Sequence, residues 1–226
     1  MKNKLDTEIE FIPSAAVRAL VKATLAAAPD CFWVMPAATT GKHHPAISVG
    51  EGGLVRHTKA VVRIALHLLS MQGILPQEAD YSAVLAACIL HDCCKKNDSE
   101  KYTAFDHPLR AGKLIRATAE GLASGILPDC CKKNDSKKLT LFYNPRRAGE
   151  FFRAMAEEEL AGETPLDQRS TMSGTIAALV ESHMGRWNTD PRSGIKLPLP
   201  LTPLERLVHC ADYLASRKDI TLADIS

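Results

Sequence analysis

Residues 82–97 read SAVLAACILHDCCKKN, an apolar run that leads directly into a histidine and an aspartate. Apolar side chains recur here at helical spacing, at Tyr81, Val84, Leu85 and Cys88. This spacing predicts a helix over residues 80–94 with one buried face. His91 and Asp92 are the next positions on that face. Because a buried carboxylate is costly unless it is paired or bound to a metal, the stretch predicts a core helix that ends in functional side chains.

The helical spacing of apolar residues continues along most of the chain, and no segment shows sustained alternation of apolar and polar residues. Aromatic residues make up only 5% of the sequence, which also disfavours a strand-rich fold. We therefore expect an all-α fold, with helices over residues 14–28, 54–71, 80–94, 108–123, 145–161, 170–185 and 203–217.

The clearest predicted helix start is at Thr202, where Pro203 and Glu205 complete a capping box with proline in the first turn. Residues 29–53 and 186–202 are interrupted by Pro and Gly, so we expect irregular structure there. Long loops in compact helical domains are often functional.

A near copy of the opening stretch follows it in the sequence. Residues 89–120 and 126–157 align without gaps and agree at 21 of 32 positions. We interpret residues 121–157 as a duplicated insert of residues 84–120, placed at the surface, because long surface insertions cost little closure entropy. A lid, a partner-binding surface and a second site are the alternatives.

The two copies differ where the chemistry is expected. The second copy has Pro128 in place of His91 and Asn144 in place of His107. Proline also removes a backbone N–H and disfavours a continuous helix at that point. The first copy is therefore the one expected to carry the site.

Length and composition favour one domain, since 226 residues with 46% hydrophobic content can bury a substantial core. We expect an N-terminal helix and loop over residues 1–40 and the core over residues 41–217. A net charge of +2 argues against a protein built mainly to bind nucleic acid. No apolar stretch reaches the length of a membrane span or leader segment, so we expect a cytoplasmic protein. The seven cysteines lack C-x-x-C spacing and are expected to be reduced thiols.

Three further predicted helices carry a polar residue on the apolar face, namely His57, His183 and Asp212. A single histidine on such a face is more often a hydrogen-bonded core residue than a metal ligand. Several groups that converge from separate helices, however, satisfy one another most simply around a cation. Together with His91 and Asp92, they favour a metal site.

The pattern of these residues resembles the HD-domain superfamily of metal-dependent phosphohydrolases. The matching segments are GGLVRHTKAV with His57, AACILHDCCKKN with His91 and Asp92, and LVHCADYLASR with Asp212. FDHPLRAG with His107 and VESHMGRWN with His183 are similar to the additional histidine elements of two-metal members, and Lys95 matches the HD-x-x-K variant.

The resemblance covers about residues 40–217, and around GKHHPAISVGEGGLVRHT it extends to YhaM-type exoribonucleases and to small phage and prophage HD proteins. It implies a helical fold with one or two divalent ions. The implied ligands are His57, His91, Asp92 and Asp212 for the first ion, and Asp92, His107 and His183 for the second. Four imidazoles and two carboxylates favour Fe, Mn, Zn, Co or Ni over Mg or Ca, independently of any family.

Cationic side chains beside these ligands are candidate phosphate binders. Lys95 lies one helical turn after His91, and we expect it to act with Asp92 in catalysis. The expected substrate-binding residues are Lys42, His44, Arg110 and Arg186. For each of these, a solvated surface charge is the alternative interpretation.

The sequence therefore predicts an enzyme that uses a metal-activated water to hydrolyse a nucleotide or a related phosphate ester, with the type of ester left open. One alternative is a di-iron oxygenase of a small polyol or phosphonate, and another is an inactive HD module that binds a nucleotide. The expected partner is a small phosphate ester, with no membrane and no strong nucleic-acid signal, and an oligomer is possible.

Overall fold

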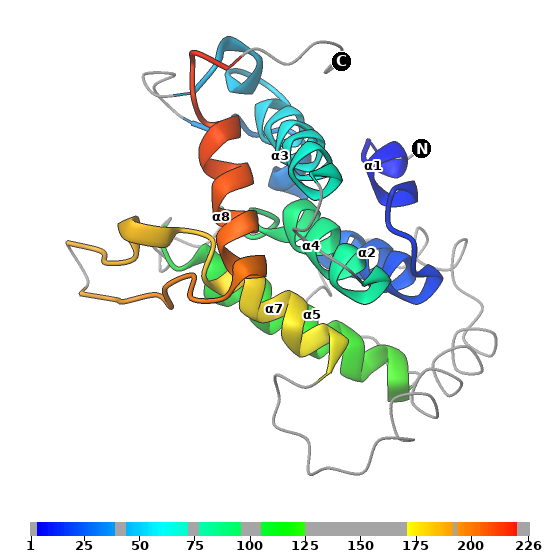
Figure 1. Cartoon of the computed structure of the whole chain (residues 1–226). Helices are drawn as coiled ribbons and strands as arrows, with labels where there is room; N and C mark the ends of the chain where they lie inside the picture. Colours follow the sequence, from blue (N-terminus) through cyan, green and yellow to red (C-terminus); the bar gives the residue numbers. More distant parts are fainter. Residues whose placement is uncertain are drawn as a thin grey trace.

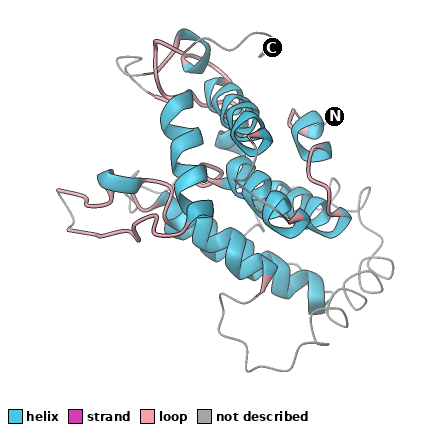
Figure 2. Cartoon of the chain, in the orientation of Figure 1, coloured by secondary structure: helices cyan, strands magenta, loops and turns pink. Residues whose placement is uncertain are grey.

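A computed structural model of the chain describes residues 4–38, 44–71, 77–95, 105–124, 171–191 and 194–220. The α-helices in these ranges are α1 (Asp6–Glu10), α2 (Ala15–Ala27), α3 (Gly53–Ser70), α4 (Glu78–Leu90), α5 (His107–Ser124), α7 (Met172–Glu181) and α8 (Pro203–Ala215). Within the same ranges, three short 3₁₀ helices lie in the connections, η1 (Asp30–Trp33), η2 (Ala46–Ser48) and η5 (Gly185–Trp187). The described part contains no strand, only one isolated antiparallel bridge (Figure 2). The predicted all-α fold is confirmed.

Helix α4 lies at the centre of the bundle. It packs against α2, α3, α7 and α8, while α5 packs along α7 and also contacts α2 (Figure 1). Every residue from 82 to 90 is buried, so α4 is covered on all sides rather than along one stripe. Small side chains such as Ala83, Ala86 and Ala87 let the neighbouring helices approach closely. The end of α4 is thereby fixed deep in the protein.

Most predicted helix boundaries agree with the structure to within a few residues. Helix α4 ends at Leu90, so His91 and Asp92 lie in the turn that follows it and not in its last turn. Helix α1 was not predicted, because five residues are too few to show a helical period. The predicted helix over residues 145–161 lies outside the described residues.

The proposed insert lies mostly outside the described residues as well. Its first residues, 121–124, continue α5, and Leu122 is buried in the core. The surface position proposed for the insert therefore does not hold for Gly121 and Leu122, whereas Ala123 and Ser124 are exposed.

The predicted capping box at the start of α8 is confirmed. The backbone N–H of Glu205 donates to the Thr202 hydroxyl at 3.2 Å, and the backbone N–H of Thr202 donates to Glu205 Oε2 at 2.8 Å. Two backbone donors that the helix leaves unpaired are satisfied in this way. The cap fixes where α8 begins and so sets the register of the residues further along it.

Arg56 holds the irregular segment before α3 in place. Its guanidinium donates to the backbone carbonyls of Ile47, Val49 and Glu51. A side chain at Gly53 would overlap the Ser48 carbonyl, so the loop lies directly against the first turn of α3. Both contacts hold this loop against the first turn of α3.

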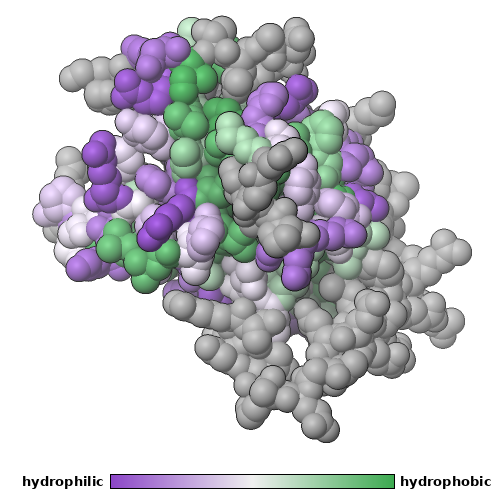
Figure 3. Space-filling model, in the orientation of Figure 1, coloured by the Kyte–Doolittle hydropathy of each residue, from purple (hydrophilic) through white to green (hydrophobic). Residues whose placement is uncertain are grey.

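None of the described helices combines the length and apolar character that a membrane span requires. The face shown in Figure 3 mixes hydrophobic and hydrophilic side chains, with the hydrophobic ones gathered over the region between α8 and α3.

Candidate metal centre

Imidazole and carboxylate groups from four places in the fold meet beside the end of α4. Two overlapping sets have ligand atoms that all lie within 4.8 Å of one another. The first trio is His57, His91 and Asp92, and the second trio is Asp92, His107 and His183. All five side chains are buried. They come from α3, from the turn after α4, from the first residue of α5 and from the turn after α7.

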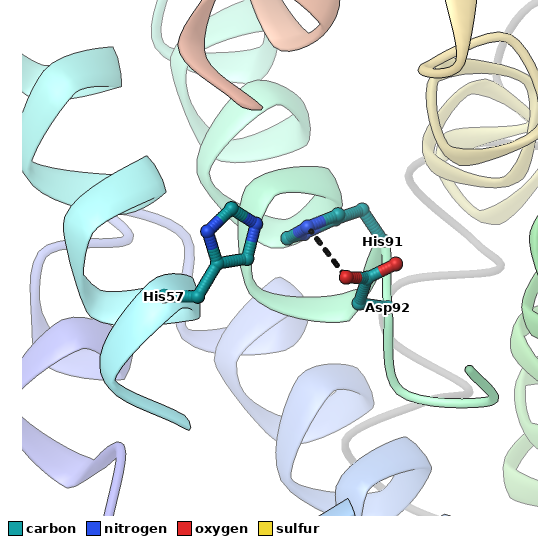
Figure 4. Close-up of side chains that lie close together, drawn as sticks. All are labelled: His57, His91 and Asp92. Atoms are coloured by element: carbon teal, nitrogen blue, oxygen red, sulfur yellow. Dashed lines mark ion pairs between the residues drawn. The ribbon is translucent and has the colours of Figure 1, made fainter. Parts of the chain in front are cut away.

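Asp92 belongs to both trios, and its two oxygens face different ones. Oδ1 lies 2.8 Å from Nε2 of His107 and 3.9 Å from Nε2 of His183. Oδ2 lies 3.5 Å from Nε2 of His91. Figure 4 shows this second contact, with the His57 ring beside the His91 ring. One carboxylate is thus placed between two groups of imidazoles.

Asp212 of α8 adds a fourth side chain to the first trio. Its Oδ1 lies 3.0 Å from Nε2 of His57 and 3.7 Å from Nε2 of His91. One fifth of the Asp212 side chain is exposed, whereas Asp92 is almost fully buried. The first trio is therefore the more accessible to solvent on its Asp212 side.

Backbone carbonyls orient two of the histidines. Nδ1 of His91 donates to the Cys88 carbonyl at 2.9 Å, and Nδ1 of His183 donates to the Val180 carbonyl at 2.7 Å. A ring that donates from Nδ1 keeps the lone pair of a neutral imidazole on Nε2, and this atom faces the cluster in both cases. Carbonyl partners of this kind commonly orient metal-binding histidines.

Nε2 of His91 is buried and has no hydrogen-bond partner among the described residues. Buried polar atoms are nearly always satisfied, and an imidazole lone pair that faces two carboxylates finds no donor in them. A cation between these groups would satisfy all of them at once. The residues present therefore fit a metal ion.

The electrostatics also suit a cation. Burial, with the nearby His91, lowers the pKa of His183 to about 3, and burial likewise lowers the pKa of His91. Burial would raise the pKa of Asp92, but the Lys95 ammonium and neighbouring imidazoles hold it well below its usual range. The pKa of Asp212 is likewise lowered, because hydrogen bonding to His57 outweighs burial. Neutral imidazoles and ionised carboxylates are the protonation states that metal ligands need.

Counting formal charges supports the same conclusion. Asp92 and Asp212 bring two negative charges, and Lys95 contributes one positive charge through an ion pair with Asp92 Oδ2 at 2.6 Å. With the imidazoles neutral, one negative charge stays uncompensated among these buried or mostly buried groups, which is costly. The cluster can hold one or two metal ions, and its nitrogen-rich donor set suits Fe, Mn, Zn, Co or Ni.

The predicted catalytic and substrate-binding residues differ in where they lie. Lys95 pairs with Asp92, as described above. The ring of His44 is 5.6 Å from that of His57, and burial, with the nearby His57, lowers the pKa of His44 to about 4. Both side chains therefore belong to the surroundings of the first trio.

The two arginines have local partners instead. Nε of Arg110 lies 3.3 Å from Oδ1 of Asp106, and Arg186 is exposed with its guanidinium 4.5 Å from the centre of the Trp187 ring. Trp187 in turn stacks on Tyr213, with 5.5 Å between ring centroids. Lys42 lies outside the described residues.

His209 was not assigned a role from the sequence, yet it supports the second trio. Its Nδ1 donates to the backbone carbonyl of His183 at 2.7 Å. Gly185 has a positive φ of 58°, and any side chain there would overlap the His209 ring. The position of His209, one turn before Asp212 on α8, was the available signal in the sequence.

No family model, curated protein or solved structure matches the chain. Its geometry defines an all-α protein with a buried His–Asp cluster that can bind metal, and this arrangement is compatible with an HD-type site.

Proposed function

We propose that this chain is a metal-dependent phosphohydrolase of the HD type, acting on a nucleotide or a related phosphate ester. The observation that carries the proposal is the placement of Asp92, whose Oδ1 faces His107 and His183 while Oδ2 faces His91. A carboxylate shared between two groups of imidazoles is the arrangement that a two-ion site requires.

The six side chains would hold the ions, with His57, His91, Asp92 and Asp212 around one and Asp92, His107 and His183 around the other. Such ions, when bound, supply a water of lowered pKa and stabilise negative charge on a phosphoryl group. The carbonyls of Cys88 and Val180 keep the His91 and His183 rings in the tautomer that presents Nε2. Because the ligands are buried, bulk water is largely excluded from the site.

Lys95 and His44 are the side chains that we propose to act on the substrate. The Lys95 ammonium keeps Asp92 ionised and stays about one-quarter exposed, at 23% of its side chain, so it can also reach a phosphate oxygen. His44 lies beside His57 and can contact a substrate that enters from that side. For Lys42, Arg110 and Arg186, a phosphate contact is proposed from the sequence alone.

The test is a metal analysis of the purified chain combined with a panel of phosphomonoesters, phosphodiesters and nucleoside triphosphates. We expect bound transition metal and phosphate release that is lost in Asp92→Asn. Asp80→Asn, at the opposite end of α4, is the matched control and should keep both properties. Turnover that depends on iron and oxygen would overturn the hydrolase proposal in favour of an oxygenase, and nucleotide binding without turnover would favour a regulatory module.

A further inference from the structure

Helices α5 and α7 are joined by an ion pair that lies apart from the metal ligands. Nη1 of Arg116 is 2.5 Å from Oε1 of Glu181, and Nη2 is 3.1 Å from Oε2. This is a two-point contact between a guanidinium and a carboxylate, the geometry that fixes orientation most strongly. It raises the pKa of Arg116, chiefly through the hydrogen bond to Glu181.

Gly112 shapes the place where Glu181 sits. It lies one turn before Arg116 on α5, and a Cβ at position 112 would overlap the Glu181 carboxylate and come within 2.8 Å of its Cγ. The missing side chain leaves a notch that the carboxylate fills. We call the arrangement of Gly112, Arg116 and Glu181 the α5–α7 socket.

The socket joins the two helices that lead to the histidines of the second trio. His107 is the first residue of α5, and Glu181 is the last residue of α7, two positions before His183. The rings of His107 and His183 are 5.3 Å apart, and both face Oδ1 of Asp92. The separation of these rings therefore depends on how α7 sits against α5.

The first trio does not depend on this contact in the same way. His57 and Asp212 come from α3 and α8, which pack against each other. Their side chains are joined directly, at 3.0 Å, without α5 or α7. A change in the socket should therefore move one trio and leave the other in place.

We infer that Arg116, Glu181 and Gly112 are positioning residues that set the affinity of the second metal ion selectively. The inference rests on the proposed two-ion site. Groups that hydrogen-bond a metal ligand directly typically change metal affinity by about 10- to 100-fold when they are mutated. The socket acts through the helices and not on a ligand side chain, so Arg116→Ala should weaken the second ion by about tenfold, the lower end of this range, and change the first by less than about threefold.

The experiment is a titration of the metal-free full-length chain with Co²⁺, followed by calorimetry and by the visible absorbance of the bound ion. The variants are Arg116→Ala, Arg116→Lys, Glu181→Gln and Gly112→Ala. Arg116→Lys keeps the charge without the two-point contact, so it should rescue the second site only in part. Should Arg116→Ala fail to fold, Arg116→Lys and Glu181→Gln test the same expectation with smaller changes.

Two controls separate positioning from a general loss of stability. Lys22→Ala removes an exposed pair with Glu10 between α1 and α2, and Ile9→Val opens a small cavity in α1. Neither should change the ratio of the two Co²⁺ affinities. If Arg116→Ala weakens both ions equally, or neither, the inference is wrong while the phosphohydrolase proposal stands.

The wild-type titration tests the two proposals separately. Two bound ions per chain are required before the socket can be judged. A single bound ion overturns the inference and leaves a one-ion hydrolase possible. A wild-type chain that binds no Co²⁺ overturns the proposed function itself.

Discussion

The two trios share Asp92 but are built differently. The first gathers side chains from α3 and the turn after α4, and Asp212 of α8 joins it by accepting from His57 at 3.0 Å. The second takes His107 from α5 and His183 from the turn after α7, and among the described residues it contains one carboxylate, which it shares. The first trio together with Asp212 thus offers four protein groups, and the second trio offers three.

This difference indicates separate tasks for the two halves of the site. Sites that keep a coordination position open suit catalysis, whereas sites closed by protein ligands suit structure. The second trio has fewer protein groups and leaves more coordination positions for water, whereas the exposed side of the cluster and the proposed substrate contacts of Lys95 and His44 lie at the first trio. Because the histidines of the two trios come from different helices, single substitutions should change the metal affinity of one trio without changing that of the other.

The largest expected effect comes from the residue that the trios share. Asp92→Asn removes the negative charge from both at once, and we expect it to weaken both ions by at least about 100-fold and abolish turnover. The measurement is metal content after gel filtration, together with phosphate release. A variant that keeps either ion at the wild-type affinity would show that the trios do not depend on a common carboxylate.

His57→Ala and His183→Ala form a matched pair that tests the comparison directly. Each removes one buried imidazole, from the first and the second trio respectively. Each should lower the metal content by one ion per chain, because the histidines of the other trio come from different helices and stay in place. Metal titration of both variants provides the check. If either substitution releases both ions, the two halves act as one unit and the comparison fails.

Much of this arrangement could be predicted from residues close together in sequence. The capping box at Thr202 and the apolar run ending in His91 and Asp92 are local patterns. The first predicted the start of its helix correctly, and the second predicted a buried helix but placed its end four residues too late. The complete burial of α4 was not visible, because its small alanines look like surface positions until neighbouring helices cover them. The pair of Arg116 with Glu181 spans 65 residues, so no local pattern indicates it.

Lys95 shows a second limit of the sequence. Its position one turn past His91 predicted a side chain beside the ligands. The structure adds that its ammonium contacts Asp92 at 2.6 Å, so it is engaged with a ligand before any phosphate arrives. Side-chain pairing inside a cluster depends on which charges meet in space, and spacing alone does not give that.

Acid should destabilise the metal-free protein through histidines of both trios. The pKa of His183 falls from 6.5 to about 3 on folding, because of burial and then His91. Below pH 6.5 the unfolded chain therefore binds a proton that the folded chain excludes, so stability falls as pH falls. At pH 5 this histidine alone removes about 2 kcal/mol relative to pH 7. His91, whose pKa is also lowered, acts in the same direction.

Urea unfolding of the metal-free chain at pH 7, 6 and 5 measures this loss. His183→Gln should reduce the pH slope by about 2 kcal/mol between pH 7 and 5. His67→Gln, at an exposed position of α3, is the control and should leave the slope unchanged. If the pH slope of His183→Gln equals that of the wild type, folding does not lower the pKa of His183.

Lys95→Met should change metal affinity less than the loss of a ligand does, and it distinguishes the two oxygens of Asp92. The ammonium contacts Oδ2, the oxygen that faces the first trio, and so repels a cation bound there. Two unit charges about 4 Å apart repel by about 1 kcal/mol in water and a divalent ion by about twice that, so the first ion should bind roughly 30-fold more tightly without Lys95. The affinity for the second ion, on the Oδ1 side, should change less, and turnover should fall if Lys95 contacts the phosphate.

Co²⁺ titration with Lys113→Met as the exposed control on α5 gives both affinities. Weaker binding of both ions would instead mean that Lys95 acts mainly by orienting Asp92, and that the two oxygens are not electrostatically separate.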